Sequence, residues 1–182
     1  MTYMTRPSTL KPFSEVTLRV PAKMHFQLVF RREVPQTQAV REVTGVQFCF
    51  IDSIGACLAN LALIQIALGP TGLIKAVLKV ARGRVFYFAH EQGRVLHTGW
   101  VTFSFCRFYR VEKGDAVIGP IWSAEAARGR GVAVYATQMA MNVLYGKGVQ
   151  VCFIDTSNGN APCLKVIEHC GFGHPVGAFI RD

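Results

Sequence analysis

The chain has 182 residues, 51% hydrophobic and 17% charged, so it can bury a core as one domain over 1–182 and is not disordered as a whole. Its formal net charge of +9 favours an anionic partner such as a nucleotide cofactor, a nucleic acid or an acidic membrane surface. Lysines and arginines are scattered without a block of five or six, so a nucleic-acid-binding arm is not indicated. A basic surface without a function is the alternative.

Six cysteines lie in apolar sequence, and their spacing fits neither a C-x-x-C pair nor a zinc site. They are Cys49, Cys57, Cys106, Cys152, Cys163 and Cys170. Such residues are typical of a reduced core, and no apolar secretory segment follows the first charges. We therefore expect a cytoplasmic protein without a metal ion.

The first part of the chain predicts little regular structure. Residues 1–14 contain two prolines and little periodicity, so we expect a loose lead-in. Residues 15–20 and 26–32 alternate apolar and polar side chains and are predicted to be short strands. Residues 37–43 match neither pattern.

Residues 54–82 form an apolar region that predicts two helices. No charged residue occurs from Ile54 to Ile74, which raises the question of a membrane span. Gly69 and Pro70 interrupt the run, and a helix over 54–68 would be about 22 Å long, shorter than a hydrocarbon core of about 30 Å. We predict helices over 54–68 and 71–82 and no span. The second helix is amphipathic and basic, so the pair either packs on the sheet or lies against an anionic membrane.

The second half of the chain has clearer periodicity. It predicts a hairpin of two strands, a third strand, a helix, a fully apolar strand, a second helix and a last strand. Their ranges are 85–90, 95–105, 115–122, 131–145, 149–154, 160–170 and 172–180. A crossover helix that leads into a buried strand gives a mixed α/β sheet.

Six residues at the start of the helix over 131–145 carry the clearest chemistry. They are Arg128, Gly129, Arg130, Gly131, Val132 and Ala133. The glycines permit a tight turn and a close ligand, a helix start attracts an anion, and the arginines add positive charge. A pyrophosphate suits such a site; the alternative is a turn that only starts a helix. Val134 replaces the third glycine of a dinucleotide-binding turn, and no G-x-x-x-x-G-K-[ST] run occurs.

This run resembles the pyrophosphate loop of the GNAT acyltransferase superfamily, whose pattern is Gln/Arg-x-x-Gly-x-Gly/Ala. Asn160, followed by a helix that ends at Gly171 and Phe172, is similar to the second signature of that family. The two signatures cover residues 84–176. The resemblance implies an acetyl-CoA-binding α/β fold. Its sheet is mostly antiparallel, with a parallel central pair splayed around the coenzyme A site and helices on both faces.

The resemblance also implies which residues contact the cofactor. Main-chain groups of Ile121, Trp122 and Ser123 would meet the pantetheine arm and the thioester carbonyl, where an N–H group can stabilise an oxyanion. Asn160 would hydrogen-bond the arm, with Cys163 beside it. The sequence departs from the family before the loop, because alanines replace the bulkier pair that precedes the arginine.

Candidates for proton transfer are less well defined. Many GNAT members use a tyrosine of the last helix as general acid; that position is Ile167 here, and neither Cys163 nor His169 replaces it convincingly. The candidate general bases are His97, Glu125, Asp155 and Asp115. His97 is the first choice because an imidazole accepts a proton near neutrality. Glu125 stands where the family usually has a proline. A strand histidine bonded to a neighbour, and an aspartate that caps the loop 156–159, are the alternative interpretations.

The sequence leads to an acetyltransferase acting on a primary amine. Residues 118–123 and His97 are similar to GNAT members that acetylate amino sugars for surface polysaccharides, so an amino sugar is the expected acceptor. A protein N-terminus, a lysine or a small amine is the alternative, as is a coenzyme A-binding regulatory module without turnover. Residues 54–82 would shape the acceptor side or contact the inner face of an anionic membrane, and a homodimer is compatible with the sequence. A nucleic-acid partner is not expected.

Overall fold

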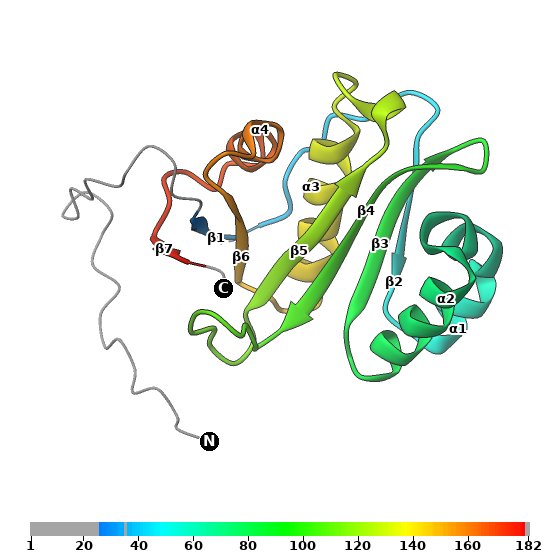
Figure 1. Ribbon diagram of the computed structural model, residues 1–182, viewed down its shortest axis with the longest axis horizontal. Helices are drawn as coiled ribbons and strands as arrows, with labels where there is room; N and C mark the ends of the chain where they lie inside the picture. Colours follow the sequence, from blue (N-terminus) through cyan, green and yellow to red (C-terminus); the bar gives the residue numbers. More distant parts are fainter. Residues whose placement is uncertain (1–25, 35, 181–182) are drawn as a thin grey trace.

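The computed structural model describes residues 26–34 and 36–180, so the predicted lead-in 1–14 and strand 15–20 lie outside the described residues. The described chain forms a seven-stranded sheet in the order β2-β3-β4-β5-β6-β1-β7 (Figure 1). The strands are β1 (Gln27–Glu33), β2 (Gln47–Ile51), β3 (Val85–Glu91), β4 (Arg94–Phe103), β5 (Ala116–Ser123), β6 (Val151–Ser157) and β7 (Gly177–Phe179). The helices are α1 (Ile54–Ala59), α2 (Leu61–Ala81), α3 (Val132–Gly146), α4 (Ala161–His169) and the short 3-10 helix η2 (Glu125–Ala127).

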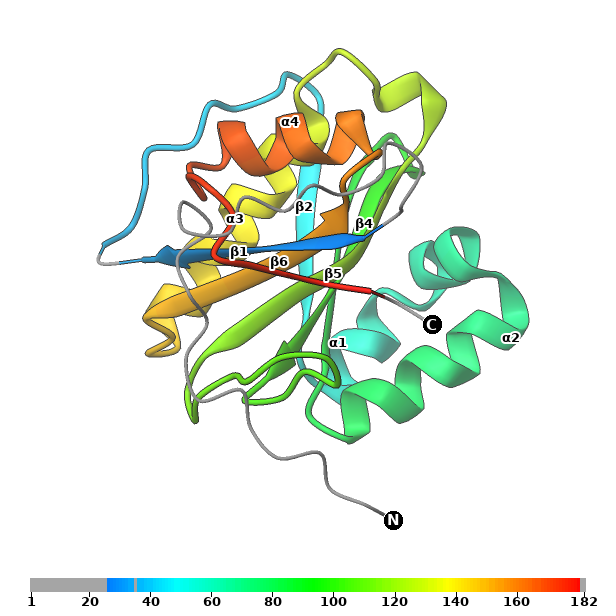
Figure 2. The same cartoon turned by 60° about the vertical axis from the view of Figure 1, so that its left-hand side comes forward.

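Helices cover both faces of the sheet, as Figure 2 shows. Helices α3 and α4 pack on one face, in a core that includes Tyr87 and Ile118, and we call this the α3 face. Helices α1 and α2 pack on the other, against Phe86, Phe88 and Trp100, and we call this the α2 face. Because side chains alternate between the faces of a strand, neighbours in sequence belong to different cores. The predicted mixed α/β fold with helices on both faces is confirmed.

Strand β3 lies between the two helical layers, and its residues from Val85 to His90 are all buried. It continues into β4 through Gln92 and Gly93, whose φ angles of 48° and 80° are both positive. Two positive φ angles are typical of a tight two-residue hairpin turn that matches the twist of the strands. The predicted hairpin is therefore confirmed.

Strands β5 and β6 form the parallel pair of the sheet, and they remain paired over only three positions. The pairs are Ala116 with Cys152, Val117 with Phe153, and Ile118 with Ile154. Beyond them β5 continues to Ser123 and β6 to Ser157, each held by its antiparallel neighbour on the far side. A register shift between β4 and β5 falls directly after the last pair. The sheet thus opens between β5 and β6 beyond these three pairs, as expected for the resembled family.

Residues 104–115 connect β4 to β5 and cover part of the α2 face. Cys106, Tyr109 and Val111 pack there on a small core whose buried members are Val29, Val117 and Phe153. The α2 face is therefore covered in two places, by α1 and α2 over β2, β3 and β4, and by residues 104–115 over β5, β6 and β1.

The apolar region 54–82 is helical and is interrupted at two places, at Asn60 and at Gly69, of which only the second was predicted. The break at Gly69 and Pro70 is confirmed, because Gly69 has φ 72° and ψ 174° inside α2. A continuous helix over 54–68 is wrong, because the Asn60 side chain donates to the carbonyl of Ala56 at 3.0 Å and ends α1. By length and composition alone, α2 could cross a membrane. The kink leaves segments of about 12 Å and about 18 Å at 1.5 Å per residue, both short of about 30 Å.

Two other elements differ from the sequence prediction. Strand β2 was not predicted. Its sequence is too short to indicate a strand by itself, and the strand forms because it pairs antiparallel with β3. The last strand is shorter than 172–180, because Phe172 still belongs to the end of α4. Its N–H donates to the carbonyl of Ile167 at 3.2 Å, and Gly171 has φ 70°. This closure is typical of a helix that ends at a glycine.

Gly99 of β4 is a position where any side chain is expected to disrupt the core. A Cβ atom there would overlap the ring and hydroxyl of Tyr87, which is fully buried. We predict that Gly99→Ala lowers the free energy of unfolding by about 1–3 kcal/mol, because a packed core resists an added methyl group. Urea unfolding measures the loss. Gly55→Ala is the control, since a Cβ there meets nothing within 4 Å. Equal stability of both variants would contradict the packing.

Candidate active site

The loop between β5 and α3 is shaped to receive an anion. Gly129 and Gly131 have φ angles of 73° and 77°, and a Cβ on either would point into open space. Helix α3 begins at Val132 without a side-chain cap. The N–H groups of its first turn therefore remain available, and the helix dipole favours negative charge at this end. The main chain thus presents donors at a surface free of side chains, which fits a pyrophosphate.

The two arginines of the loop have different surroundings. Arg130 forms a bidentate pair with Glu91 of the β3–β4 hairpin, with N–O distances of 2.6 and 3.1 Å. The guanidinium holds the pKa of Glu91 below its usual range. Arg128 is 74% exposed in its side chain, and its nearest carboxylate, Glu125, is 4.0 Å away. Arg130 therefore ties the loop to the hairpin, and Arg128 is the arginine available to a phosphate.

The open edges of β5 and β6 lie next to this loop. Beyond Ile118 the edge of β5 that faces β6 pairs with no strand of the described residues, so main-chain groups of Ile121 to Ser123 can meet a ligand there. Trp122 is 55% exposed, and its pairing with Thr98, opposite Phe88, places its side chain on the α2 face. We call the space between residues 119–123 and 155–158 the gap.

Helix α4 starts at the β6 side of the gap. The Asn160 side chain accepts a hydrogen bond from the N–H of Cys163 at 3.3 Å and caps the helix. Its exposed amide NH₂ group can still donate to a cofactor arm. Cys163 is partly buried, and burial raises the pKa of its thiol. The predicted cofactor residues Asn160 and Cys163 are thus adjacent to each other at the start of α4.

His97, our first choice of base from the sequence, is buried on the α3 face. Its Nδ1 lies 2.8 Å from the Ser123 hydroxyl, and its ring is 5.9 Å from that of Tyr87. Burial lowers its pKa to about 4, and its Nε2 has no hydrogen-bond partner among residues 26–34 and 36–180. The side chain of His97 is fully buried, and this placement favours the alternative interpretation of a strand histidine bonded to its neighbour.

Asp155 lies on the opposite face, where β6 first departs from β5. It is opposite Val29 of β1, and it follows the last parallel pair by one residue. Its carboxylate accepts a hydrogen bond from the Tyr109 hydroxyl at 3.1 Å. Burial, with the negative charge of Asp155, raises the pKa of Tyr109, which stays protonated. The sequence analysis missed Tyr109, because 46 residues separate the partners and the loop that carries it has no motif.

The other proton-transfer candidates are not placed at the gap. Glu125 lies in η2, with its side chain 91% exposed beside Arg128. Ile167 is fully buried in the core of the α3 face. The Nδ1 of His169 is bonded to the carbonyl of Lys165 at 2.7 Å. Of the sequence candidates, Asp155 is the one whose side chain lies where the gap meets the α2 face.

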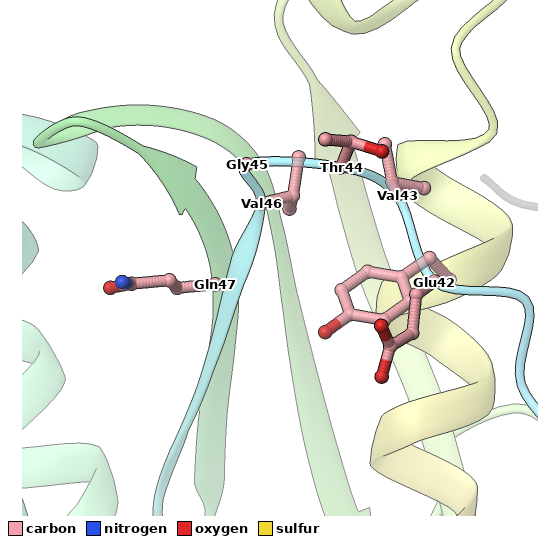
Figure 3. A pocket seen from close by; sticks show the side chains of 7 residues that line it. Glu42, Val43, Thr44, Gly45, Val46 and Gln47 are labelled. Atoms are coloured by element: carbon pink, nitrogen blue, oxygen red, sulfur yellow. The ribbon is translucent and has the colours of Figure 1, made fainter.

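An open pocket of about 470 Å³ lies away from the gap, between Tyr135 of α3 and residues 42–47. Figure 3 shows it, with the carboxylate of Glu42 directed toward α3. Burial and then the charge of Glu42 raise the pKa of Tyr135. A carboxylate in the lining disfavours a phosphate, so this pocket is not the anion site of the loop. No group of three metal-ligating side chains occurs within residues 26–34 and 36–180.

The sequence pattern of the Acetyltransferase (GNAT) family matches residues 69–172. The chain belongs to this family. Its match includes β3, β4, β5, the loop, α3, β6 and α4. No curated protein matches the chain at the sequence level.

Solved GNAT structures share the fold. One is a GNAT acetyltransferase from Colwellia psychrerythraea, with a TM-score of 0.58, 17% identity, and coverage of 83% of this chain and 53% of that one. Another is AAC(6')-Iy with the bisubstrate analogue CoA-S-monomethyl-acetylneamine, with a TM-score of 0.55, 16% identity, and coverage of 71% and 92%. A third is the aminoglycoside 6'-N-acetyltransferase AAC(6')-Ih from Acinetobacter baumannii, with a TM-score of 0.53, 14% identity, and coverage of 72% of this chain and 92% of that one. The chain spans only 53% and 47% of the first two GNAT structures it matches.

The burial of His97 predicts a pH dependence of stability. Its pKa is lowered from 6.5 to about 4 in the folded chain, so the unfolded chain binds its proton more readily. Stability from this group is complete above about pH 6.5 and is lost as the pH falls toward about 4, by on the order of 3 kcal/mol in total.

We expect His97→Asn to remove that part of the acid dependence. Urea unfolding of both proteins between about pH 7 and about pH 4 measures it, and subtraction removes the effect of carboxylates common to both. Parallel curves for the two proteins would show that His97 is not held neutral in the core.

Proposed function

We propose that this chain is an acetyl-CoA-dependent N-acetyltransferase whose acceptor is the primary amine of an amino sugar. The observation that carries the proposal is the position of the anion-binding loop directly after β5, at the strand pair that opens. An anion held at the start of α3 leaves a flexible arm attached to it within reach of the gap. Coenzyme A joins these two features in one molecule, a pyrophosphate and a thioester arm.

The residues of the chain have distinct roles in this proposal. The N–H groups of Gly131, Val132 and Ala133 bind pyrophosphate oxygens, and Arg128 adds a charged contact. On the edge of β5, a main-chain N–H near Trp122 polarises the thioester carbonyl and stabilises the charge that develops on its oxygen. These donors are fixed by the sheet before the substrate binds, so little reorganisation is needed during the reaction.

Asp155 is the proposed general base, in place of His97. The acceptor amine binds on the α2 face and attacks the thioester carbonyl through the gap. The N–C bond forms, the C–S bond breaks, the carboxylate accepts the proton of the amine, and coenzyme A leaves as a thiolate. The hydrogen bond from Tyr109 at 3.1 Å fixes the orientation of the carboxylate.

An amino sugar is supported by the exposed ring of Trp122. Its apolar face lies on the α2 face beside the gap, where the flat side of a sugar ring can pack. Two structures with this fold carry aminoglycoside acetyltransferase names, which makes aminoglycosides and nucleotide-linked amino sugars the first acceptors to test. A peptide N-terminus, a lysine and a simple amine complete the panel.

Acetyl-CoA is expected to raise the melting temperature of the chain, and Gly131→Val is expected to weaken its binding at least about tenfold. The valine is strained at φ 77° and fills the space where the phosphate would lie. Gly83→Val is the matched control, because Gly83 also has a positive φ, 80°, with open space around it, and lies outside the loop. Equal binding by both variants, or no thermal shift with the unmodified chain, would refute the cofactor site.

Asp155→Asn is expected to lower kcat about a hundredfold or more, because the amide cannot accept the amine proton, while acetyl-CoA binding is retained. Release of free thiol with the acceptor panel measures the rate, and the thermal shift measures binding. Glu112→Gln is the control, an exposed carboxylate paired with Arg110.

Three results separate the alternatives. An active Asp155→Asn variant would reject the base and leave the cofactor site intact. Turnover only with peptides or simple amines would reject the amino sugar. Binding without turnover on every acceptor would favour a coenzyme A-binding module, as the buried Ile167 in place of the family's tyrosine would allow.

A further inference from the structure

The outer surface of α1 and α2 exposes several large apolar side chains. Every fourth position from residue 58 to residue 78 is exposed, although the chain kinks at Gly69. The large apolar side chains of this surface are between 40% and 64% exposed, and they are Ile54, Leu58, Leu61, Ile66, Ile74 and Leu78. We call these six residues the apolar ridge. Six large apolar side chains on one outer surface exceed the scattered exposure that a soluble surface normally shows.

The inner side of the same helices is firmly packed. Ile64, Ala76 and Val80 are buried in the core of the α2 face, against aromatic residues of β3 and β4. Membrane insertion of α2 would have to remove these contacts. The kinked helix therefore stays on the sheet. Helices α1 and α2 lie on the side of the sheet opposite α3 and α4 (Figures 1 and 2), and the side chains of the ridge are exposed.

Basic side chains accompany the ridge, and acidic ones are absent from this part of the sequence. Lys75, Lys79, Arg82 and Arg84 lie in the second half of α2 and directly after it. No aspartate or glutamate occurs from residue 53 to residue 90. Lys79 lies over the ring of Trp100, 4.5 Å from its centre. Burial is the main cause that lowers the pKa of Lys79, and the positive charges of Arg84 and Lys75 lower it further. The surface therefore combines apolar side chains with an unbalanced positive potential.

The combination of apolar and basic side chains favours one kind of binding partner over another. A second copy of the chain packed ridge to ridge would bring two basic clusters together without a carboxylate between them, which is unfavourable. A partner must instead accept apolar side chains and supply negative charge over an extended plane. A bilayer with anionic headgroups does both, since leucine and isoleucine enter the acyl boundary while lysine and arginine remain among the headgroups.

We propose that the apolar ridge and the basic residues after it bind the surface of an anionic lipid bilayer, with α2 lying in the plane of the membrane. Each basic residue near the surface strengthens the attraction, which falls with ionic strength. The α2 face, with Asp155 and Trp122, is on the same side of the sheet as the ridge. A bound chain would therefore carry this face close to the lipid. The proposal does not depend on the acetyltransferase activity.

The experiment is co-sedimentation of the chain with vesicles of phosphatidylcholine, with and without phosphatidylglycerol. We expect binding to the anionic vesicles, weakened by salt and far weaker with phosphatidylcholine alone. Ile66→Ser with Ile74→Ser is expected to lower partitioning about tenfold or more, because both side chains are more than 60% exposed and would lose their place in the lipid. Lys75→Glu with Arg82→Glu is expected to lower it about tenfold.

The control variant is Ile180→Ser with Lys113→Glu, which changes an equally exposed isoleucine and a lysine far from α2 in sequence. It should bind vesicles as the unmodified chain does. Melting temperature and the acetyl-CoA thermal shift, measured for each variant, separate lost lipid binding from lost folding or a failed cofactor site. No binding to anionic vesicles, or binding unchanged by the ridge variants, would overturn the proposal. So would ridge variants that only dissociate a dimer in light scattering, which would identify a second copy as the occupant.

Discussion

The parallel pairing of β5 with β6 stops after three residues, and the arrangement of the site depends on that short pairing. Up to Ile118 and Ile154 the two strands are joined and their side chains fill the core. Beyond them each strand is held only by its antiparallel neighbour, so two main-chain edges face each other without closing. A ligand that supplies hydrogen bonds to these edges replaces the missing strand pairing.

The two sides of the opening carry different chemical groups. On the α3 side, the loop and the start of α3 concentrate positive potential from main-chain N–H groups, and this potential does not require a buried charge. On the α2 side, Asp155 and Tyr109 supply a carboxylate and a hydroxyl in partly buried surroundings. An anionic cofactor and a cationic or neutral amine would therefore approach from opposite faces. Such a separation would keep the proposed base away from the phosphates, whose charge would otherwise compete for the amine.

The pair formed by Arg130 and Glu91 shows how charge is used for structure as well as for binding. Neither residue is deeply buried, so the pair contributes modestly to stability. Its geometry matters more, because it joins the loop to the β3–β4 hairpin of the sheet. A loop with two positive-φ glycines loses much conformational entropy on binding if it is free, and a fixed anchor reduces that loss. Arg128 then remains exposed toward solvent and can meet a phosphate.

Local sequence predicted many of the features that depend on neighbours along the chain, although it missed the break at Asn60. Glycines and arginines before an apolar helix indicated the anion site, alternation indicated the β3–β4 hairpin, and Asn160 with Gly171 bounded α4, because turns, caps and helix starts are short-range. What required the tertiary structure were contacts between distant segments. Which arginine is free depends on Glu91, 39 residues from Arg130, and Tyr109 reaches Asp155 across 46 residues. In the sequence His97 was the first choice of base and Asp155 a further candidate. Only the sheet decided which face each occupies, because a one-residue change of register moves a side chain from the core to the opposite surface.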